Sequence, residues 1–547
     1  MGTKNLNSAT NLITFTRASG GTALRKISYG NELVTNGTFD TDISGWTSYN
    51  SVISWDAGLL KVNDSADAGG GSQAYQVVTL EVGKRYRLTG SYENSTASRL
   101  WIDNSSSNVS PNSPTADLIQ VLLPATTPSV DFAHTFVATA TTTSIALVVD
   151  LTGTGYFDNI SVKEVLFDQA DGTLQLFNHG NNVPRIEYDA DGTVKGLLIE
   201  QARTNLVTYS NDFTTSSWTR QLVSIASNVS GVTAPDGSET VDKMIPNSSN
   251  NEHRVWDGVS STAVGETYSV YAKSAGYDYV WLGYYEGSVY GYAVVNLTNG
   301  VVTASNTANY NYSVEASTNG FYRISVTKTA SGTNPRYISI SPSPTASPTL
   351  NSNNVPVYTG DGTSGIYVYG AQIEAGAFPT SYIPTTGSTA TRAADVATIP
   401  TSAFGYNSGA GSVVVEAETI NTSGTNHADL RIKTSDGFVV TDSGSRVGGY
   451  AAGSYVVYSS KTSVSMKIDS VITGGQTYKT AYTLKDNDAA LSVDGSSAIA
   501  DASTNFSGSP AFIFEIGKGY NYLNGHIKSI QYYPRRLTNA QLQELTT

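Results

Sequence analysis

Aromatic rings beside polar and charged side chains are the groups in this sequence best suited to chemistry. The densest cluster is YDYVWLGYYEGSVYGY, residues 277–292, in which Tyr284, Tyr285 and Tyr290 flank a short Glu-Gly-Ser loop. Aromatic faces stack on the C–H surfaces of sugar rings, while nearby polar groups fix the orientation of such a ligand. The pattern therefore predicts a non-covalent carbohydrate-binding surface to which these three tyrosines contribute.

Two shorter strings combine a tryptophan with an arginine two residues earlier. Trp256 follows Arg254, and Trp101 follows Arg99. Because each pair offers a stacking face and a hydrogen-bond donor, we predict Trp256, Arg254 and Trp101 as ligand contacts.

Trp281 has a different expected role. Alternation along a strand places it on one face with Tyr277 and Tyr279. Since Trp281 lies within an apolar strand, we expect that face to be the core of the domain.

Catalytic motifs are absent from the sequence. The five histidines stand too far apart for metal-ligand spacing, and no nucleophile elbow, phosphate loop or HExxH string occurs. A glycosidase needs only two carboxylates about 5–10 Å apart, which a sequence cannot reveal. Most aspartates fall in turn-forming strings, however, where hydrogen bonding to the local backbone accounts for them. We therefore predict that the chain is not an enzyme.

The composition indicates several packed β domains. The chain has 547 residues, with 51 Gly and 34 Tyr, and only 14% of the residues are charged. This length is too great for one core, and strand-forming residues alternate with Gly, Asn, Asp and Ser turns. The net charge of -13, without a basic cluster, argues against nucleic acid. No stretch approaches 18 apolar residues, so we expect no membrane insertion, and the absence of cysteine excludes disulfides.

A repeat organises the chain. The string NELVTNGTFDTDISGWT, residues 31–47, returns in altered form as TNLVTYSNDFTTSSWT, residues 204–219. Each string opens a segment with the same order of later landmarks, which predicts two copies of one β-sandwich. We expect the tryptophans of these strings, Trp46 and Trp218, to pack inside their sandwiches.

The C-terminal part has its own pattern. Alternating strands from residue 397 onward predict a third β module. Thr538 and Gln541 form a capping-box pattern, which predicts a short closing helix.

Four strings resemble a set that recurs in fibre and tail proteins of tailed bacteriophages. They are ITFTRASGGTALR (13–25), PRIEYDADGTVKGLLIEQARTNL (184–206), GAQIEAGAFPTSYIPTTGSTATRAADV (370–396) and GHIKSIQYYPRRLTNAQLQEL (525–545). The resemblance implies a protein on the exterior of a virion, bound to other virion proteins and commonly a homotrimer. Its implied role is attachment to a host-surface glycan. The alternative is a purely structural virion component, such as a capsid decoration or tail adaptor, without glycan binding.

Both sandwich copies resemble jelly-roll carbohydrate-binding modules, and the C-terminal module resembles concanavalin-like or laminin-G-like sandwiches. The implied fold class is all-β, with two jelly-roll modules and a concanavalin-like sandwich on a small β platform. Jelly rolls of this kind often hold a structural calcium ion, for which the first copy offers Glu32 and Asp158. No other cofactor is implied.

These resemblances divide the chain into five parts, the first of them split. The expected boundaries are 1–30 with 166–203 for the platform, 31–165 for the first jelly roll, 204–383 for the second, 384–400 for a linker and 401–547 for the C-terminal sandwich. In the phage set the first string runs into the second after a short gap, whereas about 160 residues separate them here. We therefore predict that the first jelly roll is inserted into the platform.

Overall fold

The computed structural model confirms the all-β fold class predicted from the sequence. It describes residues 13–64, 71–94, 98–108, 119–123, 126–149, 153–259, 265–286, 290–306, 310–328, 336–419, 427–434, 437–443, 455–459, 464–468, 475–502, 511–518 and 522–547. These residues form two compact units. The smaller unit comprises residues 26–175 and 228–240, and the larger comprises the residues up to 25, 176–227 and 241–547.

The smaller unit contains a jelly roll of two antiparallel sheets. One sheet has the strand order β10-β7-β12-β2-β13, with β5 and β4 added beside β12, and the other has the order β3-β6-β11-β8-β9. The strands are β2 (Gly21–Glu32), β3 (Thr47–Tyr49), β4 (Ser51–Asp56), β5 (Leu59–Asp64), β6 (Ser72–Thr79), β7 (Arg85–Asn94), β8 (Ser98–Asp103), β9 (Ile119–Leu123), β10 (Thr126–Val137), β11 (Thr142–Val149), β12 (Thr154–Phe167) and β13 (Thr173–His179). Trp46 packs against Phe39 between the sheets, with ring centroids 5.6 Å apart, which confirms its expected structural role.

The larger unit contains a second jelly roll. Its sheets have the orders β17-β21-β28-β23-β24-β25 and β18-β19-β30-β22-β27-β26. The strands are β17 (Thr219–Gln221), β18 (Val223–Ala226), β19 (Asp242–Pro246), β21 (Arg254–Val259), β22 (Glu266–Ala275), β23 (Tyr279–Glu286), β24 (Tyr290–Asn296), β25 (Val302–Ser305), β26 (Tyr310–Ala316), β27 (Tyr322–Lys328), β28 (Arg336–Ser343) and β30 (Gly365–Ala375). Trp218 is 1% exposed and packs on Phe213 at 4.7 Å, so its predicted structural role is also confirmed.

The two jelly rolls share one connection order. In the first jelly roll, strands β3 to β12 pair in the orders β3-β6-β11-β8-β9 and β4-β5-β12-β7-β10. In the second, the corresponding orders are β17-β21-β28-β23-β24 and β18-β19-β30-β22-β27. Strands that correspond in space also follow each other in the same order along the chain. Two additional two-stranded sheets join β16 (Arg203–Asn205) to β31 (Ala390–Arg392) and β20 (Asn250–Glu252) to β29 (Val357–Thr359). The repeat seen in the sequence is therefore a repeat of topology.

The C-terminal part is a sandwich of two seven-stranded sheets, with orders β1-β32-β41-β34-β35-β36-β37 and β14-β15-β42-β33-β38-β39-β40. Its strands are β1 (Thr14–Thr16), β14 (Ile186–Tyr188), β15 (Val194–Ile199), β32 (Val396–Pro400), β33 (Gly411–Thr419), β34 (His427–Thr434), β35 (Gly437–Ser443), β36 (Tyr455–Ser459), β37 (Val464–Ile468), β38 (Thr477–Leu484), β39 (Ala489–Val493), β40 (Ile499–Asp501), β41 (Ala511–Ile516) and β42 (Gly525–Tyr533). Helix α1 (Asn539–Thr546) closes the chain, and the predicted capping box between Thr538 and Gln541 is present. Two short 3-10 turns, Thr318–Gly320 and Thr401–Ala403, complete the regular elements.

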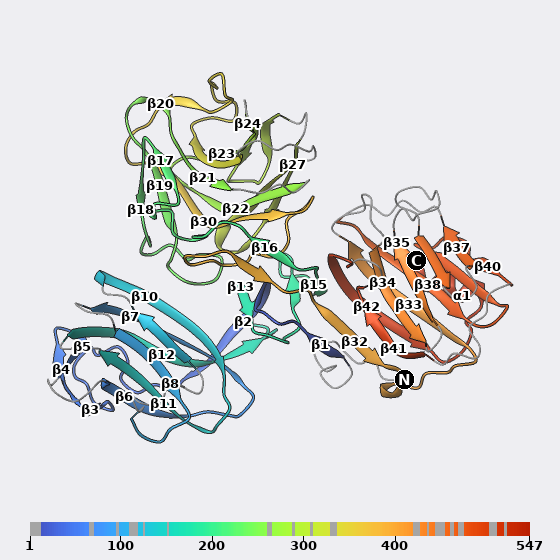
Figure 1. Ribbon diagram of the computed structural model, residues 1–547, viewed down its shortest axis with the longest axis horizontal. Helices are drawn as coiled ribbons and strands as arrows, with labels where there is room; N and C mark the ends of the chain where they lie inside the picture. Colours follow the sequence, from blue (N-terminus) through green and yellow to red (C-terminus); the bar gives the residue numbers. More distant parts are fainter. Residues whose placement is uncertain are drawn as a thin grey trace. The chain divides into compact units, whose positions relative to one another are not determined.

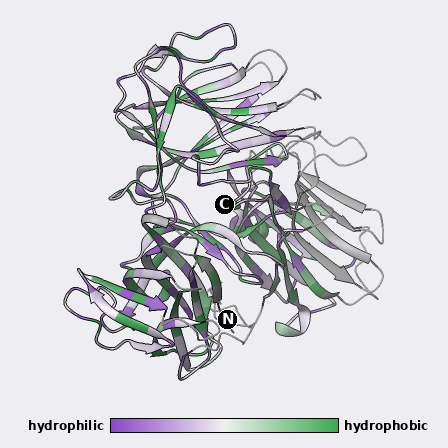
Figure 2. Cartoon of the chain, turned by 60° about the vertical axis from the view of Figure 1, so that its left-hand side comes forward, coloured by the Kyte–Doolittle hydropathy of each residue, from purple (hydrophilic) through white to green (hydrophobic). Residues whose placement is uncertain are grey.

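The segments expected to form a separate platform are divided between two domains: β2 and β13 belong to a sheet of the first jelly roll, whereas β1, β14 and β15 extend the sheets of this sandwich. β1 pairs with β32, and β15 pairs with β42, so one segment joins each sheet (Figure 1). Hydrophobic and hydrophilic residues mix along single strands (Figure 2), as expected where one face of a sheet is buried and the other is not. The domain boundaries given above stay a prediction, and residues 1–12 lie outside the described residues.

A buried network of charges joins three of the four phage-like strings. Arg17 lies 3.1 Å from Asp395, and Arg185 pairs with Asp395 and, at 2.8 Å, with Glu200. Arg392 lies 3.4 Å from Glu200. All five side chains are at most 1% exposed. Because each charge has partners within the network, the desolvation cost of burying it is offset.

Glu200 makes the stability of the larger unit dependent on pH. Burial alone would raise the pKa of its carboxyl, but Arg392, Arg185 and hydrogen bonds from Ser381 outweigh burial and hold the pKa well below the ordinary value of 4.5. A folded-state pKa below that of the unfolded chain gives stability that is present above the unfolded pKa and lost as pH falls. We therefore expect the free energy of unfolding to decrease progressively below about pH 4.5. Urea unfolding at stepped pH would measure this decrease, and Glu200→Gln should reduce the slope; an equal slope in both proteins would contradict the prediction.

Candidate functional site

One face of the second jelly roll gathers half-buried aromatic side chains. Along β21, β28, β23 and β24 the backbone pairs Trp256 with Ser339, Ser339 with Gly283, and Gly283 with Tyr292. The residues between them point the other way and form the inter-sheet core, for example Val255. The row therefore lies on the outer face of the sheet, which we call the aromatic face and define by Trp256, Tyr285, Tyr292, Tyr337 and Arg254.

The Trp281 ring covers Gly283, which lies in the middle of this row. A Cβ placed on Gly283 would come within 2.1 Å of the Trp281 ring, so that ring lies across the glycine. The Trp281 and Tyr292 rings stack with centroids 6.2 Å apart. Trp281 is fully buried beneath Leu350 and Val355, outside the inter-sheet core. Trp281 is therefore buried, as expected, but in a separate cluster, because the inter-sheet core takes the alternate residues of the strand.

Arg254 lies over the ring of Trp256. Its guanidinium carbon lies 4.6 Å from the centre of the Trp256 ring. Glu252 accepts a hydrogen bond from Arg254 at 3.3 Å and another from Asn351 at 3.0 Å, and Gln221 accepts from Arg254 at 3.4 Å. The Arg254 side chain is 13% exposed. Because its position is fixed, the arginine presents a preorganised donor beside a stacking ring.

Tyr285 lies on the same face in the next row. Its ring centroid is 5.7 Å from that of Tyr337, which is its backbone partner on β28. The structure thus brings together three predicted contacts, Trp256, Arg254 and Tyr285. The predicted contact Tyr290 pairs with Tyr285 through the backbone, but its side chain lies outside the described residues.

Tyr284 is a correction to the sequence analysis. It is fully buried in the inter-sheet core, and its hydroxyl donates to Glu266 at 2.6 Å. The physical reason is strand alternation, because two adjacent residues cannot both face outward. Tyr284 therefore cannot contact a ligand on the aromatic face.

Trp101 occupies the corresponding outer face in the first jelly roll. It is 4% exposed and packs with Ala146, Val148 and Tyr75 in a small cluster outside the main core. By register, Tyr75 takes the place of Trp256, since it pairs with Thr47 as Trp256 pairs with Thr219. Tyr75, Tyr292 and Tyr337 were missed from the sequence because only strand register reveals which tyrosines share a face.

The calcium site expected at Glu32 and Asp158 stays a prediction. The Glu32 carboxylate accepts hydrogen bonds from the backbone amides of Leu33, Val34 and Val162 and from the Ser161 hydroxyl. Asp158 accepts from the Asn159 amide and side chain. Among the described residues, no three His, Cys, Asp or Glu side chains are grouped closely enough to hold a metal ion.

The close contact at Gly283 gives a testable expectation. Gly283→Ala should destabilise the larger unit by about 1–3 kcal/mol, because the added methyl displaces the Trp281 ring from a packed cluster. Urea unfolding would measure the loss. Gly405→Ala is the matched control, since no atom lies within 4 Å of the Cβ position there. Equal stability of the two variants would contradict the packing argument.

Among the comparisons with known proteins, only the one with solved structures finds matches to this chain. No protein-family model and no curated protein match the chain. A CBM4 carbohydrate-binding module is 18% identical, with 24% of this chain and 99% of that chain covered and a TM-score of 0.21. The tandem CBM22 domains of Paenibacillus barcinonensis Xyn10C are 11% identical over 64% of this chain and 99% of theirs, with a TM-score of 0.20. The LG1-3 region of the laminin alpha2 chain is 10% identical over 97% of both chains, with a TM-score of 0.19.

The prediction that the chain is not an enzyme is corrected by the same search. The sialidase of Trypanosoma rangeli matches 96% of this chain and 93% of its own, at 8% identity and a TM-score of 0.20. The structures that this chain resembles therefore include an enzyme as well as binding modules. At TM-scores this low, none of the matches assigns a reaction or a ligand.

Within the described residues, no helix has the length and apolar character needed to cross a membrane.

Proposed function

We propose that the chain binds a carbohydrate through the aromatic face of the second jelly roll. The observation that carries the proposal is the Trp256–Arg254 pair, an indole with a guanidinium fixed at 4.6 Å. Tyr285, Tyr292 and Tyr337 continue the same sheet face. Half-buried rings of this kind give stacking area at little cost in conformational entropy. A sugar bound at the Trp256 end of this face would stack on the indole ring and receive hydrogen bonds from the arginine.

We further propose that this binding attaches a virion to its host. The support is the resemblance of four sequence strings to bacteriophage fibre and tail proteins. In this setting the protein would lie on the particle exterior, bound to other virion proteins, and its glycan partner would lie on the host surface. Assembly as a homotrimer would multiply weak individual sites into strong attachment.

A glycan array combined with a cell-adsorption assay tests the proposal. We expect the purified chain to bind a subset of host-surface glycans and to compete with virions for host cells. Failure to bind any glycan or cell would contradict it. If antibodies against the aromatic face label isolated protein but not intact virions, the face is covered by neighbouring proteins, and the purely structural role is correct instead.

A further inference from the structure

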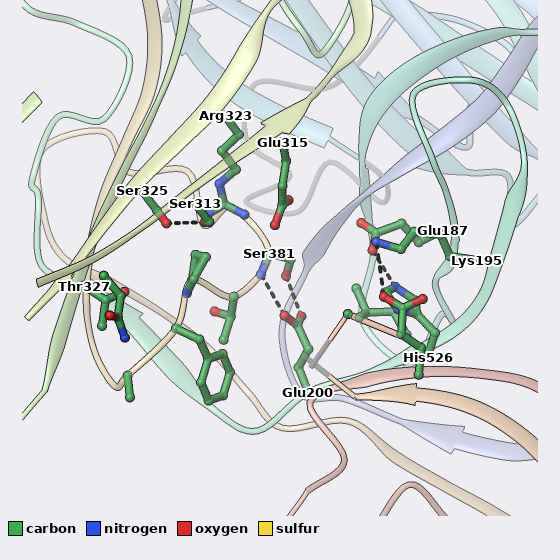
Figure 3. Close-up of a pocket in the computed structure, with 18 of the residues that line it drawn as sticks. Glu187, Lys195, Glu200, Ser313, Glu315, Arg323, Ser325, Thr327, Ser381 and His526 are labelled. Atoms are coloured by element: carbon green, nitrogen blue, oxygen red, sulfur yellow. Dashed lines mark hydrogen bonds and ion pairs between the residues drawn. The ribbon is translucent and has the colours of Figure 1, made fainter. Parts of the chain in front are cut away.

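A cavity lies within the larger unit, and no residue of the aromatic face lines it. Its volume is about 290 Å³. Figure 3 shows Arg323 and Glu315 on one side of it and Glu187, Lys195 and His526 on another. The first pair comes from the second jelly roll, and the others come from strands of the C-terminal sandwich. Nothing in the aromatic face contributes to this cavity.

The jelly-roll wall of the cavity is rich in hydroxyl groups. Ser313 and Ser325 share a hydrogen bond of 2.6 Å between β26 and β27, and Thr327 follows on the same face. Ser381 lines the cavity from the segment after β30. Hydroxyls can both donate and accept, so this wall suits a ligand that carries several hydroxyls of its own.

Most of the charged side chains that line the cavity already have a partner of opposite charge. Glu187 lies 2.6 Å from His526, and Lys195 lies 3.9 Å from Glu418. Burial alone would lower the pKa of Lys195, but Glu187, Glu418 and Glu315 outweigh it and raise the pKa, which keeps the amine charged. Arg323 faces Glu315 from the neighbouring strand, since the two residues are backbone partners. Because most of these charges are already paired, the wall favours a neutral ligand over an anion or a cation.

Two buried polar atoms of the lining are left without a hydrogen bond. Among the described residues, neither Nδ1 of His526 nor Nε of Arg323 has a partner. The His526 side chain is 1% exposed. Buried polar groups in folded proteins are almost always paired, and a ligand with several hydroxyls would supply partners to these two atoms.

We propose that this cavity binds one neutral, polyhydroxylated ring of monosaccharide size. Its volume lies just below the range of about 300–1,000 Å³ seen for small-molecule sites, which suits a single ring. Hydroxyls of the ring would pair with Arg323, Glu315 and the serine wall. The proposal does not depend on glycan binding at the aromatic face.

Titration calorimetry on the full chain tests the proposal with a defined panel. The neutral probes are glucose, galactose, mannose and N-acetylglucosamine; the charged probes are glucuronate and glucosamine. We expect at least one neutral sugar to saturate one site per chain below about 10 mM, with charged analogues about tenfold weaker. If no neutral sugar saturates, the proposal is wrong.

Two variants and a control locate the site. Arg323→Met and Glu315→Gln should each weaken binding of the neutral sugar about tenfold. If Arg323→Met does not fold, Glu315→Gln alone tests the site, because Glu315 is exposed and its substitution leaves the core intact. Trp256→Ala should leave this binding unchanged, even where it abolishes adsorption to glycans. Loss of monosaccharide binding in Trp256→Ala, with full binding in both cavity variants, would place the sugar on the aromatic face and overturn the proposal.

Chemical labelling tests independently where on the chain the sugar binds. Bound sugar should slow acylation of the Lys195 amine, whose side chain is 22% exposed, and leave Lys485, at 44% exposed, unchanged. Mass spectrometry of labelled peptides measures both rates. Unchanged labelling of Lys195 at saturating sugar would contradict binding in the cavity.

Discussion

Asp395→Ala is expected to lower the free energy of unfolding of the larger unit by about 3–5 kcal/mol, the cost typical of breaking a buried ion pair. Asp395 pairs with Arg17 and Arg185 and also accepts a hydrogen bond from the Glu200 backbone amide at 2.9 Å. Without Asp395, three buried guanidinium groups would share a single carboxylate. The uncompensated charge, and not the lost contact alone, is the reason for the large effect.

Urea unfolding followed by tryptophan fluorescence measures this loss. Asp278→Ala is the matched control in the same unit, because Asp278 is exposed and its carboxylate accepts a hydrogen bond from Ser274 at 2.8 Å. We expect the control to lose less than about 1 kcal/mol. If Asp395→Ala loses no more than the control, the network is not a stabilising element of the fold.

Trp256→Ala is expected to weaken binding to a recognised glycan about 30-fold, which corresponds to the loss of one strong contact residue. The substitution removes the stacking ring and also the surface on which Arg254 lies. Because the Trp256 side chain is only half-buried on the outer face, the inter-sheet core stays intact. Affinity on immobilised glycan and adsorption to host cells would both measure the effect.

Tyr284→Phe is the matched control for Trp256→Ala. It changes an aromatic residue of the same sheet, but one that faces the core and donates to Glu266. We expect it to leave glycan affinity unchanged while lowering stability by about 1–3 kcal/mol, since Glu266 is left with a buried, less satisfied carboxylate. If Tyr284→Phe weakens glycan binding as much as Trp256→Ala does, binding does not occur on the aromatic face.

Some of the candidate site could be predicted from the sequence, and the remainder could not. Trp256 and Arg254 were found because a ring close to a cation in the sequence offers both a stacking face and a hydrogen-bond donor. Tyr292 and Tyr337 join them through pairing between strands, which depends on register and is invisible in one strand. Tyr284 was misplaced for a related reason, because a run of two tyrosines does not state which of them faces inward.

The sequence by itself determined the all-β class, the repeat that opens at residues 31 and 204, the packing of Trp46 and Trp218, and the capped C-terminal helix. These features depend on local periodicity, turn chemistry and capping, which residues close in sequence specify. Only the tertiary structure decided that Arg17, Arg185, Arg392, Glu200 and Asp395 meet, and that Glu187 contacts His526, 339 residues later in the chain. Contacts between distant residues follow from sheet pairing and the packing of whole modules, and no local pattern encodes them.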